Sequence, residues 1–320
     1  MKIGHLYNLN SFKAFMDSAK KPGFADAYAG TVLARNLTAV DPRLFEKKFP
    51  ELTFVNSGVQ ADNSGGYARR IQSLRVIDLG GFTTSGDASG NKGRISLMAE
   101  DSFLKVIVRE ADSVWTDDEI KEAELQNINL VQRYVQAHNS AYMREIDQIG
   151  LLGGVAGIGT GLLNYSGFTA TGAGGAIETL TAQQMYDAVA GLITDQFNAV
   201  NNTPEYMADR VIMPVDVMNK LNVTILNSAA GSSTVLRALQ DNFGGVQFLA
   251  SFRAANTGAG VSATVAFSSS EEVMKMRIPV PLTIGEIIKQ GSFDYKVDSK
   301  YRIAGLDVLE NTGGRILTGL

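Results

Sequence analysis

Histidine is the residue that most often serves as a general base near neutral pH, and the chain has it only at positions 5 and 138. A serine–histidine–acid triad, an HExxH zinc site or a histidine cluster would have to use His5 or His138. His138 falls on the apolar side of a helical pattern, where we expect a partly buried histidine with satisfied ring nitrogens. Cysteine is absent, which excludes a disulfide framework and thiolate metal ligands and fits assembly in a reducing cytoplasm.

Five acidic side chains near the strongest helical pattern could in principle ligate a hard cation such as Mg²⁺ or Ca²⁺. They are Glu110, Asp112, Asp117, Asp118 and Glu119. The last three fall in the first turn of the expected helix, where carboxylates stabilise the positive end of the helix dipole. Helix capping therefore accounts for them, and we expect neither a metal nor any other cofactor.

Glycines crowd the segment GGVAGIGTGLLN, residues 153–164, as they do in phosphate-binding loops. The segment lacks the GxxxxGK[ST] pattern, and the spacing of Gly157, Gly159 and Gly161 differs from GxGxxG. No serine lies in a GxSxG motif, since Asn164 stands two places before Ser166. We interpret the run as a structural turn. The sequence therefore predicts no catalytic residue and no enzyme.

The composition is that of an ordinary globular protein, with 320 residues, 45% hydrophobic and 19% charged residues, and a formal net charge of −4. Because no long basic run occurs, contact with DNA should be weak and non-specific. No segment is apolar enough for a bilayer span or a secretory signal. We expect a protein that stays in the cytosol and does not contact a membrane.

The first part of the chain lacks the patterns of a self-contained core. Residues 1–66 mix polar and apolar side chains without a period and predict an arm that lies on something else. Residues 67–79 have strand-forming side chains but no cleanly apolar face, so that strand cannot be central. Five glycines follow among residues 80–93, and a second strand is expected over 94–108. Together these segments predict a long hairpin with a glycine-rich tip.

The strongest helical pattern begins at Thr116, where TDDE forms a capping box between Thr116 and Glu119. It predicts a helix over 117–149 that would be about 50 Å long if unbroken. One side carries apolar residues that include Val131, Val135 and Tyr142. The opposite side is a polar stripe that ends at Asp147.

The rest of the chain alternates helix and strand signals. The signals predict a capped helix from Thr181, further helices after Pro214 and over 233–243, and strands at 210–213, 246–250, 263–267, 273–278 and 293–303. The last of these strands alternates inward residues such as Phe293 and Val297 with charged residues, and it would suit the long helix as a packing partner. The fold class is therefore α+β.

Several segments in this order resemble the major capsid protein family of tailed bacteriophages, whose fold encapsulin shells share. They are FLKVIVREADSVWTDDE leading into the helix, DQIGLLGG, GIGTGLLN, RVIMPVDVMNKL and YRIAGLDVLENTGG. The resemblance covers most of the chain and implies five parts. They are an N-terminal arm and lead-in (1–66), an E-loop hairpin (67–98), a peripheral domain with a spine helix at 117–149 (99–180), an axial domain (181–289), and closing strands of the peripheral domain (290–320).

The resemblance implies a coat subunit that forms hexamers and pentamers of an icosahedral shell around phage double-stranded DNA. The E-loop, with Gly81, Phe82, Lys92 and Arg94, would contact a neighbouring subunit. Portal, scaffolding or decoration proteins would be further partners, with assembly in the bacterial host cytoplasm and a final place in the virion capsid. Some members of the family crosslink an E-loop lysine to a neighbour's asparagine, and Lys92 and Asn311 hold loosely similar places, but we expect no crosslink here.

Three other interpretations compete with this one. An encapsulin-type nanocompartment would share the fold, but the long N-terminal arm favours a phage protein. An α/β enzyme with an unrecognised site would need convergent polar groups that the sequence does not supply. A phage surface-binding module is disfavoured because the helix-rich pattern does not fit a β-sandwich.

Overall fold

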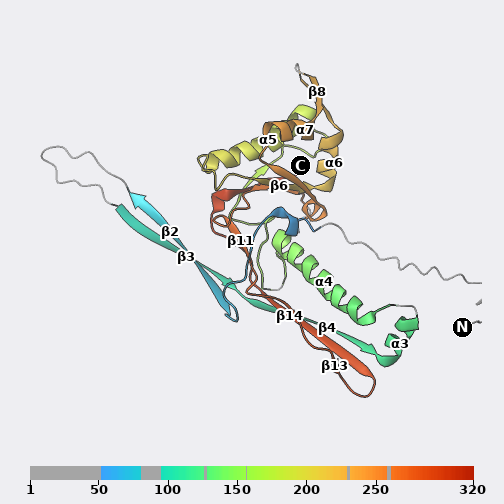
Figure 1. Cartoon of the computed structure of the whole chain (residues 1–320). Coiled ribbons are helices and arrows are strands. Elements are labelled where there is room, and N and C mark those ends of the chain that lie inside the picture. The colour runs from blue at the N-terminus through green and yellow to red at the C-terminus, as the bar shows by residue number, and fades with distance from the viewer. Residues whose placement is uncertain (1–51, 81–94, 126–127, 156, 229–230, 258–260) are drawn as a thin grey trace, which may run out of the picture. The chain divides into compact units, whose positions relative to one another are not determined.

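The computed structural model describes residues 52–80, 95–125, 128–155, 157–228, 231–257 and 261–320 (Figure 1). It confirms a fold of mixed helices and sheets. Within the described residues, the sheets are one of five strands, one of four, one of three and two two-stranded hairpins. None of the helices in these ranges is both long and apolar enough to cross a bilayer.

The five-stranded sheet has the strand order β5-β16-β10-β6-β9. Its strands are β5 (Thr169–Gly172), β16 (Gly314–Thr318), β10 (Ala263–Phe267), β6 (Arg210–Pro214) and β9 (Gln247–Ser251). The central strand β10 runs antiparallel to β16 and β6 and is buried along its whole length. It alternates between two cores, since Val265 and Phe267 face one cluster and Ala266 faces the other.

Side chains of three helices form much of the core cluster that Ala266 faces; Figure 1 shows these helices. They are α5 (Ala182–Ala199), α6 (Val215–Val223) and α7 (Val235–Asn242). Helix α5 begins at the predicted place, with a capping box in which Thr181 accepts from the Gln184 amide and the Gln184 side chain accepts from the Thr181 amide. Near them, β7 (Ile225–Ser228) and β8 (Gly231–Thr234) form a small hairpin.

The second large sheet is built on β14 (Asp294–Ile303), which pairs with β4 (Ile107–Thr116) along its full length. On its other edge β14 pairs with β12 (Val280–Ile284) and β13 (Ile288–Lys289). The predicted alternation of β14 is confirmed at Val297, Tyr301 and Ile303, which are buried. It is wrong at Phe293, which precedes the strand and is exposed.

The predicted spine helix is two helices, and the expectation of one unbroken helix over 117–149 was wrong. Helix α3 spans Asp117–Leu125 and α4 spans Leu130–Leu152. Asn129 provides the physical reason, because its side chain accepts from the Gln132 amide and so caps a new helix. Helix α4 is about 35 Å long at 1.5 Å per residue.

The lead-in before the hairpin belongs to the core, although its sequence predicts an arm. Short helix η1 (Val55–Ser57) follows Phe54, which is buried in the first core cluster. Strand β1 (Ala61–Asp62) joins β11 (Met274–Arg277), which in turn pairs with β15 (Gly305–Val308). The predicted arm segment up to residue 51 lies outside the described residues.

Strand pairing also crosses the predicted domain boundaries. Strand β16, assigned by sequence to the closing strands of the peripheral domain, lies in the five-stranded sheet beside β10. Strands β12 and β13, assigned to the axial domain, pair with β14. Boundaries placed along the sequence miss these pairings. Pairing between strands that are far apart in the chain depends on how they pack, which local sequence patterns do not predict.

Candidate functional site

His138 links helix α4 to both long strands of the four-stranded sheet. Its Nδ1 lies 2.8 Å from Ser299 Oγ and its Nε2 lies 3.0 Å from Ser113 Oγ. Because Ser299 Oγ already donates to the Ala111 carbonyl, it can accept from Nδ1–H while Ser113 donates to Nε2. No carboxylate of a described residue takes part, and the ring is buried. The imidazole therefore fastens α4 to the sheet, as its sequence position predicts.

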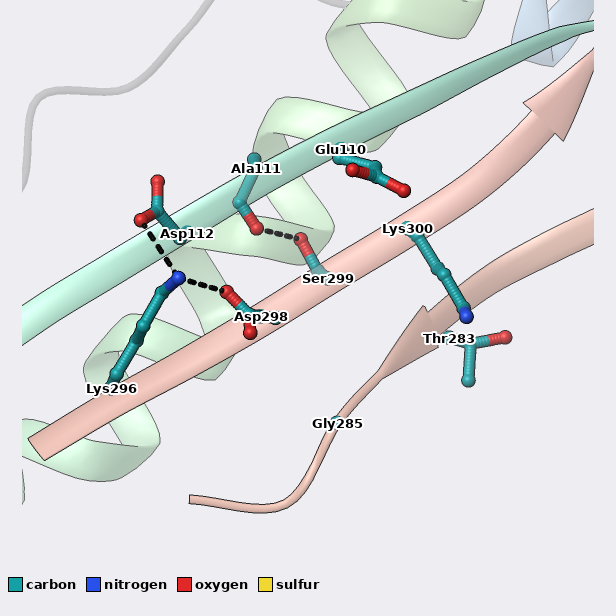
Figure 2. A pocket seen from close by; sticks show the side chains of 9 residues that line it. All are labelled: Glu110, Ala111, Asp112, Thr283, Gly285, Lys296, Asp298, Ser299 and Lys300. Atoms are coloured by element: carbon teal, nitrogen blue, oxygen red, sulfur yellow. Dashed lines mark hydrogen bonds and ion pairs between the residues drawn. The ribbon is translucent and has the colours of Figure 1, made fainter. Parts of the chain in front are cut away.

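Of the five acidic residues considered for a cation, Asp112 pairs with a lysine, and Asp117, Asp118 and Glu119 lie in the first turn of α3. A pocket of about 550 Å³ on the four-stranded sheet is lined by Glu110, Asp112, Lys296, Asp298 and Lys300, among others (Figure 2). Lys296 bridges Asp112 and Asp298 at 3.4 and 3.0 Å. These two carboxylates raise the pKa of Lys296 above its ordinary value, whereas a lysine nucleophile needs a lowered pKa. Among the described residues, no acidic or histidine cluster suits a metal ion.

The glycine run forms the structural turn that its sequence predicts. Gly153 has a φ of +62° and lies against the backbone of Gly159 and Thr160. Asn164 closes the turn, because its Oδ1 accepts from the Gly161 amide at 2.7 Å and its Nδ2 donates to the Leu152 carbonyl at 2.9 Å. These bonds are internal to the chain and hold the turn closed.

Among the described residues, several exposed apolar side chains gather on the hairpin of β2 (Arg70–Gly80) and β3 (Ile95–Lys105). Within the described residues these two strands pair only with each other. The register puts alternate residues of each strand on one face. Five large apolar side chains of this face are 57–72% exposed: Leu74, Val76, Ile95, Leu97 and Phe103. We call them the apolar face of the hairpin.

The opposite face of the hairpin contacts the rest of the subunit near its base. Ile71 and Ser73 are buried there. Arg75 forms an ion pair with Glu310, which follows β15. Arg302 of β14 donates to the Tyr67 carbonyl and stacks on the Tyr67 ring at 4.8 Å. One face is thus attached to the rest of the subunit, while no described residue of its own chain covers the apolar face.

The residues expected to contact a neighbour, Gly81, Phe82, Lys92 and Arg94, lie outside the described residues. Of the pair considered for a crosslink, only Asn311 is described, and its Oδ1 accepts from the Tyr165 hydroxyl at 3.2 Å. The sequence missed the apolar face itself. The alternation of Leu74 and Val76 with polar residues was a usable signal, but Arg70 and Gln72 on the same face obscured it.

The predicted helix residues divide between α3 and α4. The capping box is present, since the Thr116 amide donates to Glu119 Oε2 at 3.0 Å and the Glu119 amide donates to Thr116 Oγ1 at 3.3 Å. On α4, Val131 and Val135 are half-buried, and Tyr142 packs edge-to-face on Tyr301 with ring centroids 4.9 Å apart. Tyr142 thus packs the helix against β14 of the four-stranded sheet.

Asp147 departs from its predicted place on the polar stripe, because it is fully buried. Its Oδ1 accepts from the Phe54 amide at 2.7 Å, and its Oδ2 pairs with Arg253 at 2.9 Å. A buried carboxylate needs such partners, since desolvation without them would cost several kcal/mol. The residue ties together α4, the lead-in segment and helix η2 (Phe252–Ala255).

Comparison with known proteins identifies a family for this chain. The family model for major capsid proteins matches residues 88–319. The chain is similar to a structure described as the capsid of Myoviridae phage XM1, with 44% identity, a TM-score of 0.81, and coverage of 90% of this chain and 98% of that one. Among proteins with curated descriptions, none matches the chain.

More distant structures share the fold. A Mycobacterium phage Ogopogo structure has 13% identity and a TM-score of 0.61, and it covers 90% of this chain and 98% of its own. A structure described as the capsid of a native GTA particle has 12% identity, a TM-score of 0.67 and the same two coverages.

Proposed function

Because the chain belongs to the major capsid protein family of tailed phages, and so is a phage coat protein that forms a shell with copies of itself, we propose that its hairpin covers a neighbouring copy in that shell. The apolar face of the hairpin carries this proposal. Burying a large apolar side chain contributes about 1.5–3 kcal/mol, so five such side chains left in water favour association strongly. An exposed apolar stripe of this kind marks an interaction surface.

The finer features of the proposal are an icosahedral shell of hexamers and pentamers around double-stranded DNA, assembled in the bacterial cytoplasm. Contact with the DNA is weak and non-specific, in keeping with the net charge of −4. Portal, scaffolding and decoration proteins are the further partners that such a shell needs. The role is structural and not enzymatic, which agrees with the raised pKa of Lys296 and with the pairing of both His138 ring nitrogens to serine hydroxyls.

The test substitutes residues of the apolar face and leaves the rest of the subunit unchanged. In the triple variant Leu74→Ser, Leu97→Ser and Phe103→Ser, each changed side chain is already exposed in the free subunit. We expect the melting temperature of the free subunit to stay within about 2 °C, since exposed substitutions change stability by about 0.5 kcal/mol or less. Closed particles in negative-stain micrographs should disappear.

The matched control is Ser96→Ala with Ser102→Ala, on the opposite face of the same strand. It should assemble like the parent. Normal closed shells from the triple variant would refute the role of the apolar face. A parent protein that remains a monomer under every assembly condition, including with its scaffold, would refute shell formation itself.

A further inference from the structure

A buried charged network joins the hairpin to the body at Ser73. Asp307 of β15 is almost fully buried and accepts from the Ser73 hydroxyl at 2.6 Å and from Arg277 Nε at 2.9 Å. The other two guanidinium nitrogens of Arg277 also have partners. Nη2 donates to Ser73 Oγ at 3.1 Å, and Nη1 pairs with Asp62. The Ser73 hydroxyl thus donates to a buried carboxylate and accepts from the guanidinium that neutralises it.

The next body-facing residue of β2 makes a second charged contact, because Arg75 pairs with Glu310. Ser73 and Arg75 are two residues apart and therefore lie on the same face of the strand. Their partners follow one another on the chain in β15 and just after it. Two consecutive positions of the hairpin are thus bonded to one segment of the body.

The network opposes any swing of the hairpin away from the body. Such a movement would leave the carboxylate of Asp307 without one of its donors, in a place that water does not reach freely. An unsatisfied hydrogen bond to a buried charge costs about 1.5–3 kcal/mol. An opening with that cost is populated at roughly 7% or less.

We propose that Ser73 and Arg75, with Arg277, Asp307 and Glu310, form a latch that holds the hairpin in one orientation in the free subunit, before any neighbour covers it. The proposal rests on the shell-building role proposed above and adds a positioning function to it. A hairpin held in advance does not lose its orientational freedom when it docks, so a neighbour binds it faster and in one geometry. The latch residues act through the apolar face and do not touch the neighbour.

A substitution at Ser73 tests the latch separately from the stability of the rest of the subunit. Asp62, Arg277 and Asp307 also bond to one another across β1, β11 and β15, so changing any of them disturbs the body. Ser73 is the hairpin's own member of the network. Gln72, the preceding residue of β2, lies on the opposite and exposed face and provides a matched control.

The absence of cysteine permits a direct measurement of hairpin orientation. Spin labels on Leu97→Cys in the hairpin and Gln136→Cys on the exposed side of α4 report one distance in dilute, unassembled subunits. We expect a narrow distance distribution in the labelled parent. Ser73→Ala should broaden it roughly twofold, as a locally opening element does. Ser73→Thr keeps the hydroxyl and should restore the narrow distribution, and Gln72→Ala should leave it unchanged.

A distribution in Ser73→Ala as narrow as that of the parent would overturn the proposal. If Ser73→Ala does not fold, Arg75→Ala decides the question, because Arg75 is partly exposed and its loss should broaden the distribution as well. The spectroscopy uses free subunits, so its outcome does not depend on shell formation. In assembly, we expect Ser73→Ala to give slower growth and more open particles than Gln72→Ala.

Discussion

At the scale of single residues, Gly150 and Phe54 explain how a segment without any periodic pattern becomes part of the core. Gly150 lies in the last turn of α4 and is buried against the Phe54 ring. A Cβ at position 150 would lie 2.4 Å from that ring, so only glycine lets the ring pack there. The Phe54 amide donates to Asp147 one turn earlier on the same helix. The contact fixes the lead-in segment on the helix end.

Gly150→Ala should therefore destabilise the free subunit by roughly 1–3 kcal/mol, because the Phe54 ring must leave its place. Thermal unfolding of unassembled protein measures the loss. Gly191→Ala in α5 is the control, since an added Cβ there meets nothing within 4 Å. That change should stabilise by about 0.5–1 kcal/mol, as alanine does in a helix interior. An unchanged melting temperature in Gly150→Ala would contradict the packing of Phe54.

The sequence predicted most of these single-residue features of the structure, and it missed one of them. The capping boxes at Thr116 and Thr181 and the buried His138 were predicted because each depends on neighbours within a few positions. The burial of Asp147 was not, because its helical phase places it with solvated residues. Its partners Phe54 and Arg253 come from distant parts of the chain, so no local pattern contains them.

At the scale of secondary-structure elements, the four-stranded sheet depends on helix α4 as its packing partner. It carries His138 and Tyr142 to the strands β4 and β14 and Asp147 to the lead-in segment. The helical pattern was predicted correctly from residue 130 onward. The break before it was missed, because polar residues at positions 126, 127 and 129 suit a helix surface as well as a cap.

Val135→Pro should unfold the subunit or lower its stability by about 3 kcal/mol or more, since proline removes a backbone hydrogen bond and clashes with the preceding turn. Circular dichroism and thermal unfolding test this expectation. Ser140→Ala, on the exposed side of the same helix, should be nearly silent. A Val135→Pro protein that melts like the parent would refute the packing role of α4.

At the scale of the whole molecule, each of the three larger sheets in the described residues contains a strand from the last part of the chain. Strand β14 is the centre of the four-stranded sheet, β15 completes the three-stranded sheet, and β16 lies inside the five-stranded sheet. The sequence predicted the family to which the fold belongs and the strands β2, β3, β6, β9, β10, β11 and β14. It did not predict which sheet each late strand joins, since that depends on contacts between distant segments.

A fragment ending at Phe293 should therefore lack a stable fold, because β14, β15 and β16 are all removed. We expect loss of cooperative melting and rapid digestion by protease, even though every residue of α4, α5, α6 and α7 is still present. Circular dichroism and limited proteolysis of the fragment beside the full chain provide the measurement. A fragment that melts cooperatively near the full-length temperature would show that the late strands are dispensable.

The late position of these strands also bears on how the protein is made. When residue 293 leaves the ribosome, none of the three larger sheets in the described residues can yet be complete, so these sheets finish folding only after β14, β15 and β16 have emerged. Pairing between distant segments is slow compared with helix formation. A prematurely terminated chain would expose strand edges and be open to degradation. Only copies that contain all three late strands would then present a hairpin fixed to a folded subunit, which would exclude chains that end before β14 from the growing particle.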